Sequence, residues 1–185
     1  MIHSIRIRRA RPEDARGIAA VHVESWRSAY AGILPDRVMV QMSVDQKAVS
    51  WRRQIEATAN SQGLLVAELP EGGIAGFASC GRPTSALAGF DGEIFMLYVM
   101  PDWQEQGLGR GLLCGSLQLM AKNGCGSALV WVLADNPARF FYEAMEGKRV
   151  GEKDEAIWGV TLHQIAYGWR SLSPLPAACR GRRRP

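Results

Sequence analysis

The residues best suited to chemistry form a glycine-containing turn at 104–110. Its sequence, Gln-Glu-Gln-Gly-Leu-Gly-Arg, follows an apolar run at 93–99 that predicts a buried strand, and it opens a periodic stretch to residue 122 that predicts a helix. The first N–H groups of a helix have no intrahelical partner and the dipole is positive there. Backbone without side chains at Gly107 and Gly109 can therefore approach an anion closely, which indicates a phosphate site. Turns of this kind also occur for packing alone.

Two other nucleotide-binding motifs do not fit this turn. No Gly-Lys-Ser or Gly-Lys-Thr follows it, which excludes a P-loop. The spacing Gly107-x-Gly109 continues to Leu112, where the dinucleotide fingerprint requires glycine. That fingerprint also follows the first strand of its unit, whereas this turn follows the fourth expected strand.

The elements that must position the turn alternate between strand and helix patterns. The expected strands lie at 5–8, 64–69, 74–80, 93–99, 128–133, 148–152 and 156–169. The expected helices run from 11 to about 30, in pieces within 35–59, from 107 to 122 and from 136 to 145. This order predicts an α/β fold, a single domain with a mixed central sheet of about seven strands and helices on both faces.

Charge divides the chain into a neutral body and a basic end. The 185 residues carry a net charge of +4, and five arginines with no acid lie at 170–185. Residues 1–169 therefore form the expected domain, and 170–185 the expected mobile tail, rich in proline and like charges. A nucleic-acid-binding protein would rest on that tail alone, so no nucleic-acid partner is expected.

Metal sites and membrane segments have no pattern in the sequence. Four cysteines and three histidines show neither a CxxC pair nor metal-ligand spacing, so no metal is expected. The first residues lack the apolar run of a signal peptide, and no stretch approaches the ~18 apolar residues of a membrane span. We expect a cytoplasmic protein without a membrane partner.

Two segments resemble the GCN5-related N-acetyltransferase (GNAT) family. Gln104-x-x-Gly107-x-Gly109 matches the family's Gln/Arg-x-x-Gly-x-Gly/Ala signature and follows a Leu-Tyr-Val strand. Residues 133–143, Leu-Ala-Asp-Asn-Pro-Ala-Arg-Phe-Phe-Tyr-Glu, resemble the family's second acyl-CoA segment, although 146–148, Glu-Gly-Lys, depart from the usual glycine ending. The resemblance covers roughly residues 4–169. It implies the GNAT fold and transfer of an acyl group, most simply from acetyl-CoA to a primary amine.

The resemblance also implies where acetyl-CoA binds. The backbone of Leu97, Tyr98 and Val99 would pair with the pantetheine arm as a further strand does, and Asn136 would bond the same arm. The pyrophosphate would lie on the amides of the turn, formed by Gln104, Glu105, Gln106, Gly107, Leu108, Gly109 and Arg110. The Arg110 side chain would add a charge near the phosphates or would be an ordinary solvated helix residue.

Two side chains carry the catalytic roles that the family uses. An amine with a pKa near ~10 is almost fully protonated at neutral pH, so a base must accept its proton. Glu93, eleven residues before Gln104, has the spacing of the general base in one branch of the family; its alternative is an exposed strand-end carboxylate. Tyr142 matches the general acid that protonates the departing thiolate, and its alternative is packing. A backbone N–H near Val99 would stabilise negative charge on the thioester oxygen.

The acceptor site is the least specified part. In the family it lies between the first two helices and the loop joining the last two strands, here 26–35 and 152–155. Trp26, Arg27 and Tyr30 are candidate lining residues, although Trp26 also fits the helix core, and the acids at 152–155 favour a cationic amine or form a solvated turn. We expect a small-molecule or protein amine acceptor and a monomer or homodimer. A non-catalytic acyl-CoA-binding or regulatory module, which needs no base or acid, is the alternative function.

Overall fold

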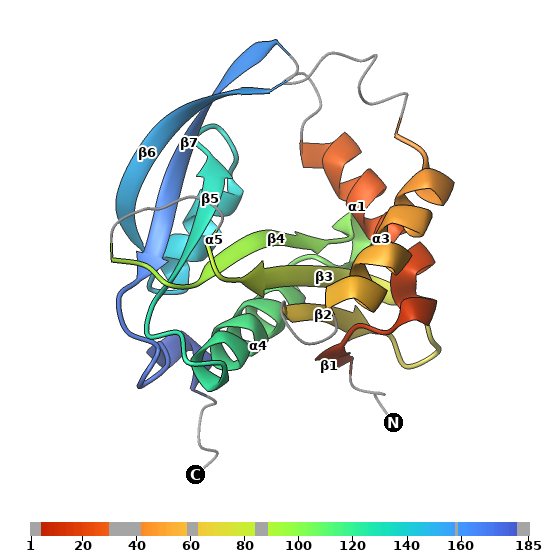
Figure 1. The fold of residues 1–185 in the computed structure, drawn as a ribbon, viewed down its shortest axis with the longest axis horizontal. Helices are drawn as coiled ribbons and strands as arrows, with labels where there is room; N and C mark the ends of the chain where they lie inside the picture. The colour runs from red at the N-terminus through yellow and green to blue at the C-terminus, as the bar shows by residue number, and fades with distance from the viewer. Residues whose placement is uncertain (1–4, 30–41, 59–62, 84–88, 158, 181–185) are drawn as a thin grey trace. The chain divides into compact units, whose positions relative to one another are not determined.

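The seven strands of the chain form one mixed sheet in the order β1-β2-β3-β4-β5-β7-β6. The structure is a computed structural model, and it describes residues 5–29, 42–58, 63–83, 89–157 and 159–180. The strands are β1 (Arg6–Arg9), β2 (Gly63–Glu68), β3 (Ile74–Gly81), β4 (Glu93–Val99), β5 (Ala128–Leu133), β6 (Lys148–Ile157) and β7 (Val160–Trp169) (Figure 1). The α-helices are α1 (Ala15–Ala29), α3 (Val44–Thr58), α4 (Leu108–Lys122) and α5 (Ala138–Ala144). The predicted fold class is confirmed.

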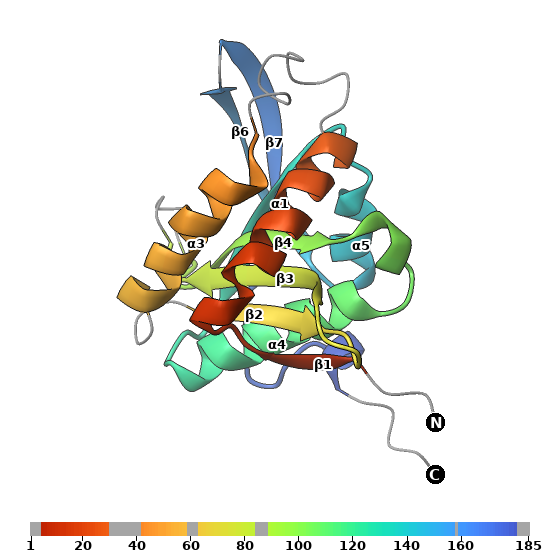
Figure 2. The same cartoon turned by 90° about the vertical axis from the view of Figure 1, so that its right-hand side faces the viewer.

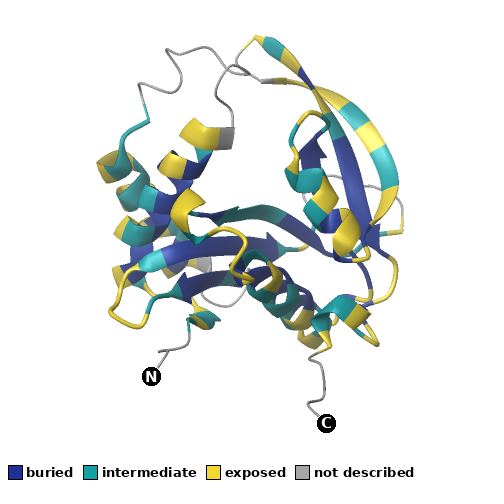
Figure 3. Ribbon diagram, turned by 180° about the vertical axis from the view of Figure 1, so that it is seen from behind, coloured by how far each residue is buried: buried dark blue, intermediate teal, exposed yellow. Residues whose placement is uncertain are grey.

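The chain divides into two compact units. The first contains Met1–Ser79 and Met96–Ser116, and the second contains Cys80–Phe95 and Leu117–Pro185. Buried positions follow the strands in each unit (Figure 3). None of the helices within the described ranges is long and apolar enough to cross a membrane.

The first unit has helices on both faces of its strands. Helices α1 and α3 lie side by side (Figure 2) and pack on β2 and β3 through a core that includes Ile18, Trp51, Val66 and Phe77. Neighbouring side chains in β1 and β2 point the other way, so that a Cβ added at Gly115 of α4 would lie 2.9 Å from Leu65. This alternation is the two-residue period of a strand covered on both sides.

One buried ion-pair network fixes β1 to the start of α1. The Arg8 guanidinium bonds Asp14 at 2.6 Å and Glu68 at 2.7 Å, and it holds the pKa of each carboxyl below its ordinary value, although burial opposes the shift, most strongly at Asp14. Asp14 also accepts the backbone N–H of Arg11 at 2.7 Å. The side chains of Arg8 and Asp14 are each 10% exposed. Removing either one would leave the charge of the other largely out of water without this partner, which would destabilise the fold.

The second unit is built on β5, β7 and β6, which pair antiparallel. The start of β4 joins β5 in parallel, with Glu93 opposite Leu129 and Ile94 opposite Val130. Helix α5 covers the face that carries Tyr167, because the Tyr142 ring stacks on the Tyr167 ring at 6.3 Å. The indole N–H of Trp169 donates to the carbonyl of Met145 at 2.9 Å and ties the end of β7 to the end of α5.

The segment after β7 corrects the expectation of a mobile tail for residues 170–180. Leu172 is 2% exposed and its N–H donates to the Gly126 carbonyl at 2.9 Å. The Arg170 guanidinium lies over the Phe90 ring, and the backbone N–H of Ala178 donates to Glu146 at 2.7 Å. Leu172 and Pro176 are the buried residues of this segment. Residues 181–185, with the last three arginines, lie outside the described residues.

Candidate active site

The turn after β4 is held by the glutamine of the motif. The Gln104 side-chain amide donates to the Val99 carbonyl at 3.2 Å, and the Gln104 backbone N–H donates to Pro101 at 3.2 Å. A short 3-10 helix, η2 (Pro101–Trp103), fills the space between them. The motif glutamine therefore links the turn to the end of β4.

Backbone conformation at the turn explains its glycines. Glu105 has φ 60° and Gly107 has φ 85°, both left-handed. A Cβ added at Gly107 would meet nothing within 4 Å, so this position favours glycine for its conformation and not for space. The α4 hydrogen bonds begin with the Gly111 N–H donating to Gly107 at 3.0 Å.

The start of α4 fits the anion that the sequence indicates. Because the first intrahelical donor of α4 is Gly111, the amides of Leu108, Gly109 and Arg110 precede the helical ladder. The turn at 104–107 is exposed, so an anion can reach those amides from solvent. A pyrophosphate site requires the positive end of a helix dipole, N–H groups without an intrahelical partner, and small residues, and this turn has these properties.

The side chain of Tyr98 links β4 to α1. The indole N–H of Trp26 donates to the Tyr98 hydroxyl at 3.1 Å, and Trp26 is half-buried. Tyr98 was expected to contribute its backbone only, so this link was missed. Leu97 and Val99, its neighbours in β4, lie in the same unit.

A buried histidine stands at the centre of this aromatic cluster. The Trp51 indole donates to Nδ1 of His22 at 3.3 Å, which leaves the ring proton of the neutral imidazole on Nε2. The His22 ring stacks on Tyr98 at 5.8 Å and lies 5.7 Å from Trp26. Burial, with a smaller contribution from Lys47, lowers the pKa of His22 to about 4. His22 and Trp26 lie four residues apart, on one face of α1, but no sequence signal identified their partners.

Glu93 is buried at the start of β4, with 7% of its surface exposed. It lies in the second unit opposite Leu129 of β5. The alternative of an exposed strand-end carboxylate therefore does not hold.

Tyr142 and Asn136 also belong to the second unit. Tyr142 is 5% exposed, and its ring contacts Phe141 at 5.2 Å as well as Tyr167. The Asn136 side-chain oxygen accepts the N–H of Ala138, the first residue of α5, at 2.8 Å, and the helix begins there rather than at Asn136. The predicted residues thus fall into two sets. Trp26, the strand end 97–99 and the turn 104–110 lie in the first unit, while Glu93, Asn136 and Tyr142 lie in the second.

The expected acceptor residues are only partly described. Tyr30 lies outside the described residues. The acids at 152–155 are not in a loop: they lie in β6 and pair with β7 residues 162–165. Asp154 bonds Nδ1 of His163 at 2.7 Å, and Glu152 forms an ion pair with Arg149. These carboxylates therefore have partners within the hairpin.

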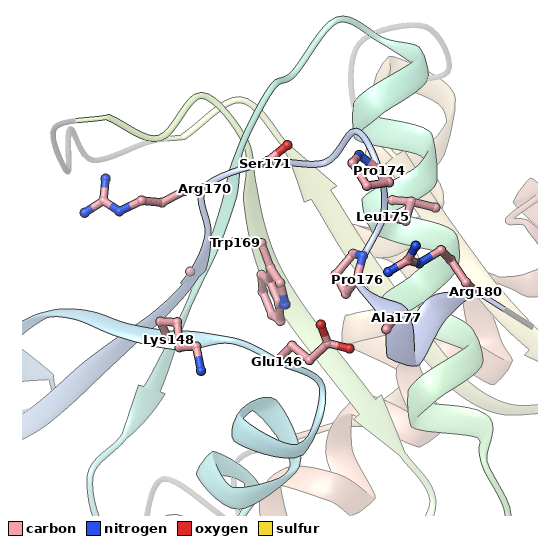
Figure 4. A pocket seen from close by; sticks show the side chains of 11 residues that line it. Glu146, Lys148, Trp169, Arg170, Ser171, Pro174, Leu175, Pro176, Ala177 and Arg180 are labelled. Atoms are coloured by element: carbon pink, nitrogen blue, oxygen red, sulfur yellow. The ribbon is translucent and has the colours of Figure 1, made fainter.

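A pocket of about 340 Å³ lies between the end of β7 and the segment that follows it (Figure 4). Trp169 forms one wall, and Lys148, Arg170 and Arg180 supply positive charge. The charged ends of Lys148 and Arg170 point in different directions, so the three cations do not converge on one point. Across the described ranges, no group of three or more His, Cys, Asp or Glu residues is arranged to hold a metal ion.

Comparisons with known proteins agree on one family. The model of the acetyltransferase (GNAT) family matches residues 23–147. The uncharacterized N-acetyltransferase YuaI of Bacillus subtilis strain 168 is 35% identical over 171 residues, which cover 92% of this chain and 96% of the relative. A spermidine N(1)-acetyltransferase of Thermoplasma acidophilum is 23% identical over 82% of this chain and 92% of its own length.

Solved structures show the same fold. The PaiA N-acetyltransferase of Thermoplasma acidophilum, in complex with coenzyme A, aligns with a TM-score of 0.64 at 22% identity, over 90% of this chain and 99% of that one. The yncA protein of Salmonella typhimurium, solved with its cofactor acetyl-CoA, aligns with a TM-score of 0.65 at 20% identity, over 90% and 93%. The chain therefore belongs to the GNAT family and is an N-acetyltransferase.

Proposed function

We propose that this enzyme transfers the acetyl group of acetyl-CoA to a primary amine by direct attack. The observation that carries the proposal is the turn before α4. Glu105 and Gly107 have left-handed backbone conformations there, and the N–H groups that follow precede the first hydrogen bond of the helix. Two structural neighbours contain coenzyme A or acetyl-CoA, which supports the same donor here. Acetyl-CoA, when bound, supplies the acetyl group as a reactive thioester.

Backbone groups of the first unit bind the donor in this proposal. The amides of the turn take the pyrophosphate, with charge from Arg110, and the backbone of 97–99 pairs with the pantetheine arm. The β4 residues that pair with β5 are Glu93 and Ile94, the first two of the seven residues of β4. This register is consistent with a ligand that pairs farther along the strand. An N–H near Val99 stabilises negative charge on the carbonyl oxygen.

Proton transfers are assigned to two buried side chains. Glu93 accepts the amine proton, directly or through water, and Tyr142 donates its hydroxyl proton to the departing sulfur. Asn136 bonds the pantetheine arm with the side-chain NH₂, since its oxygen already caps α5. Trp26 and Tyr30 line the acceptor site, and spermidine is the first acceptor to test because one relative is named for it.

Three single variants test the proton-transfer roles. Tyr142→Phe keeps the ring and its stacking on Tyr167, so stability should hold while turnover falls by about 10², the lower end of general acid catalysis, since a thiolate is already a fair leaving group. Tyr167→Phe is the matched control: it deletes a hydroxyl bonded to Glu143 at 2.6 Å in the same unit and should leave turnover unchanged. Glu93→Gln should lower turnover at neutral pH and regain part of it at high pH, where free amine is abundant.

Two results would contradict these roles. Parent-like turnover of Tyr142→Phe across the pH range would remove the acid assignment. A Glu93→Gln profile parallel to that of the parent enzyme would remove the base assignment.

A further inference from the structure

An aspartate just before β4 is bound by the loop that leads into β5. The Asp91 carboxylate accepts the N–H of Gly126 at 2.9 Å and both the N–H and the hydroxyl of Ser127, at 2.8 and 2.7 Å. Its own N–H donates to the Ser127 hydroxyl oxygen at 3.1 Å, and the Cys125 thiol donates to its carbonyl at 3.4 Å. Three consecutive residues of one loop thus hold a single aspartate by main chain and side chain.

The next residue leaves no space in this contact. A Cβ added at Gly92 would lie 2.7 Å from the Ser127 carbonyl oxygen and 2.9 Å from the Met120 sulfur. The Gly92 carbonyl in turn accepts the N–H of Leu129 at 3.0 Å. Asp91 and Gly92 therefore pack directly against the loop of residues 125–127, and β4 starts at the next residue.

The carboxylate is ionised at neutral pH. Burial alone raises the pKa of Asp91, but the hydrogen bonds from Gly126 and Ser127 outweigh burial and hold the pKa below its ordinary value. Hydrogen bonds to a charged acceptor are shorter and stronger than those between neutral groups. The contact is thus an anionic clamp, defined here as Asp91 with Cys125, Gly126 and Ser127.

Glu93 lies two residues after Asp91, at the start of β4. Its pairing with β5 consists of two residue pairs at a strand end, where ladders fray most easily. A carboxylate that exchanges a proton with substrate must keep its place within about 0.5 Å. On the β5 side the ladder contributes these two pairs, and the clamp begins two residues before Glu93.

We propose that Asp91 is a positioning residue for Glu93, holding the start of β4 against β5 so that the buried Glu93 carboxylate keeps one location. This inference rests on the proposed role of Glu93 as base. Asp91 touches no reacting atom in it and acts only through its neighbour.

Hydrogen exchange tests the clamp itself. Asp91→Asn keeps the shape but replaces the anion with a neutral amide, so exchange of the Leu129 amide should rise at least tenfold, while amides of α1 stay unchanged. Ser127→Ala deletes only the hydroxyl and should change exchange in the same direction by less. Asp45→Asn is the control. It removes an exposed carboxylate of α3 that pairs with Arg16 of α1, and it should have no effect at Leu129.

A double variant tests whether the clamp acts through Glu93. Asp91→Asn should lower turnover about tenfold at neutral pH with the KM for acetyl-CoA unchanged, and the loss should shrink at high pH as in Glu93→Gln. Combined with Glu93→Gln it should cost nothing further, because the group it positions is already gone.

Three outcomes overturn the inference, and they differ from one another. Unchanged exchange at Leu129 means that there is no clamp. If the fold-losses in turnover of Asp91→Asn and Glu93→Gln multiply in the double variant, Asp91 acts independently of Glu93, and the proposed function stands. Full activity of Glu93→Gln removes the base assignment, and this inference falls with it.

Discussion

Stability of the fold should depend on pH through His22, and the dependence can be worked out in advance. The imidazole is neutral in the native protein because burial lowers its pKa to about 4 from the ordinary 6.5. Between these values the unfolded chain binds a proton that the native state does not, so acid favours unfolding. The contribution of His22 to stability is therefore complete above pH 6.5 and is lost as the pH falls toward 4.

The size of this effect follows from the two pKa values. The full difference corresponds to about 3 kcal/mol, since each pKa unit is worth about 1.4 kcal/mol. Between pH 7 and pH 5 the linkage relation gives a loss of about 2 kcal/mol in the free energy of unfolding. The pKa values of Asp14, Glu68 and Asp91 are also lowered, so these carboxylates remove stability in acid as well.

A variant isolates the histidine from those carboxylates. His22→Asn removes the titrating group and retains an acceptor for the Trp51 indole. Urea unfolding of both proteins, followed by tryptophan fluorescence at pH 7 and pH 5, should show the parent losing about 2 kcal/mol more than the variant. Parallel losses in the two proteins would refute the conclusion that His22 is held neutral by burial.

Four further changes have expected outcomes. Leu172→Ala should cost about 2–5 kcal/mol of unfolding free energy in urea titrations, because the side chain is 2% exposed, and truncation after Trp169 should destabilise for the same reason. Asp14→Ala should cost about 1.5–3 kcal/mol, because the Arg8 guanidinium loses its closest partner and keeps Glu68. Gly109→Glu places a side chain and a negative charge at the first turn of α4, so calorimetry should detect no acetyl-CoA binding while the circular dichroism stays native.

Each of the three substitutions has a control in the same chain. Leu175→Ala alters a half-buried side chain of the same segment and should cost less than the Leu172 variant. Glu68→Gln alters the more exposed partner of the network, 31% exposed, and should cost less than the loss of Asp14. Val49→Glu adds the same charge at an exposed position of α3 and should bind acetyl-CoA normally. Equal effects of variant and control would contradict the structural reason given for that variant.

Local sequence patterns predicted several elements of the fold. The apolar runs gave the bounds of β4 and β5, and the motif gave the start of α4. The hairpin of β6 and β7 was only partly predicted, because an exposed antiparallel pair needs no apolar residues at 152–155. Its polar residues therefore resemble a turn until their partners are known.

Contacts between distant residues could not be predicted. Asp91 bonds residues 35 and 36 positions away, and the Trp51 indole bonds His22 across 29 positions. Composition likewise predicted a mobile tail, since two leucines among prolines, serines and arginines give no periodic signal. Leu172 is held by a backbone hydrogen bond to Gly126, 46 positions away, and its side chain is 2% exposed.

The central claim, that the turn at 104–110 holds acetyl-CoA, is tested most directly by hydrogen exchange with and without acetyl-CoA. Amides of 105–110 precede the α4 ladder, so a bound pyrophosphate should slow their exchange strongly, whereas acetate at the same concentration should not. The Gly109→Glu protein should show no such protection. Protection confined to other segments, for example the pocket at 174–180, with the turn unchanged, would contradict the account.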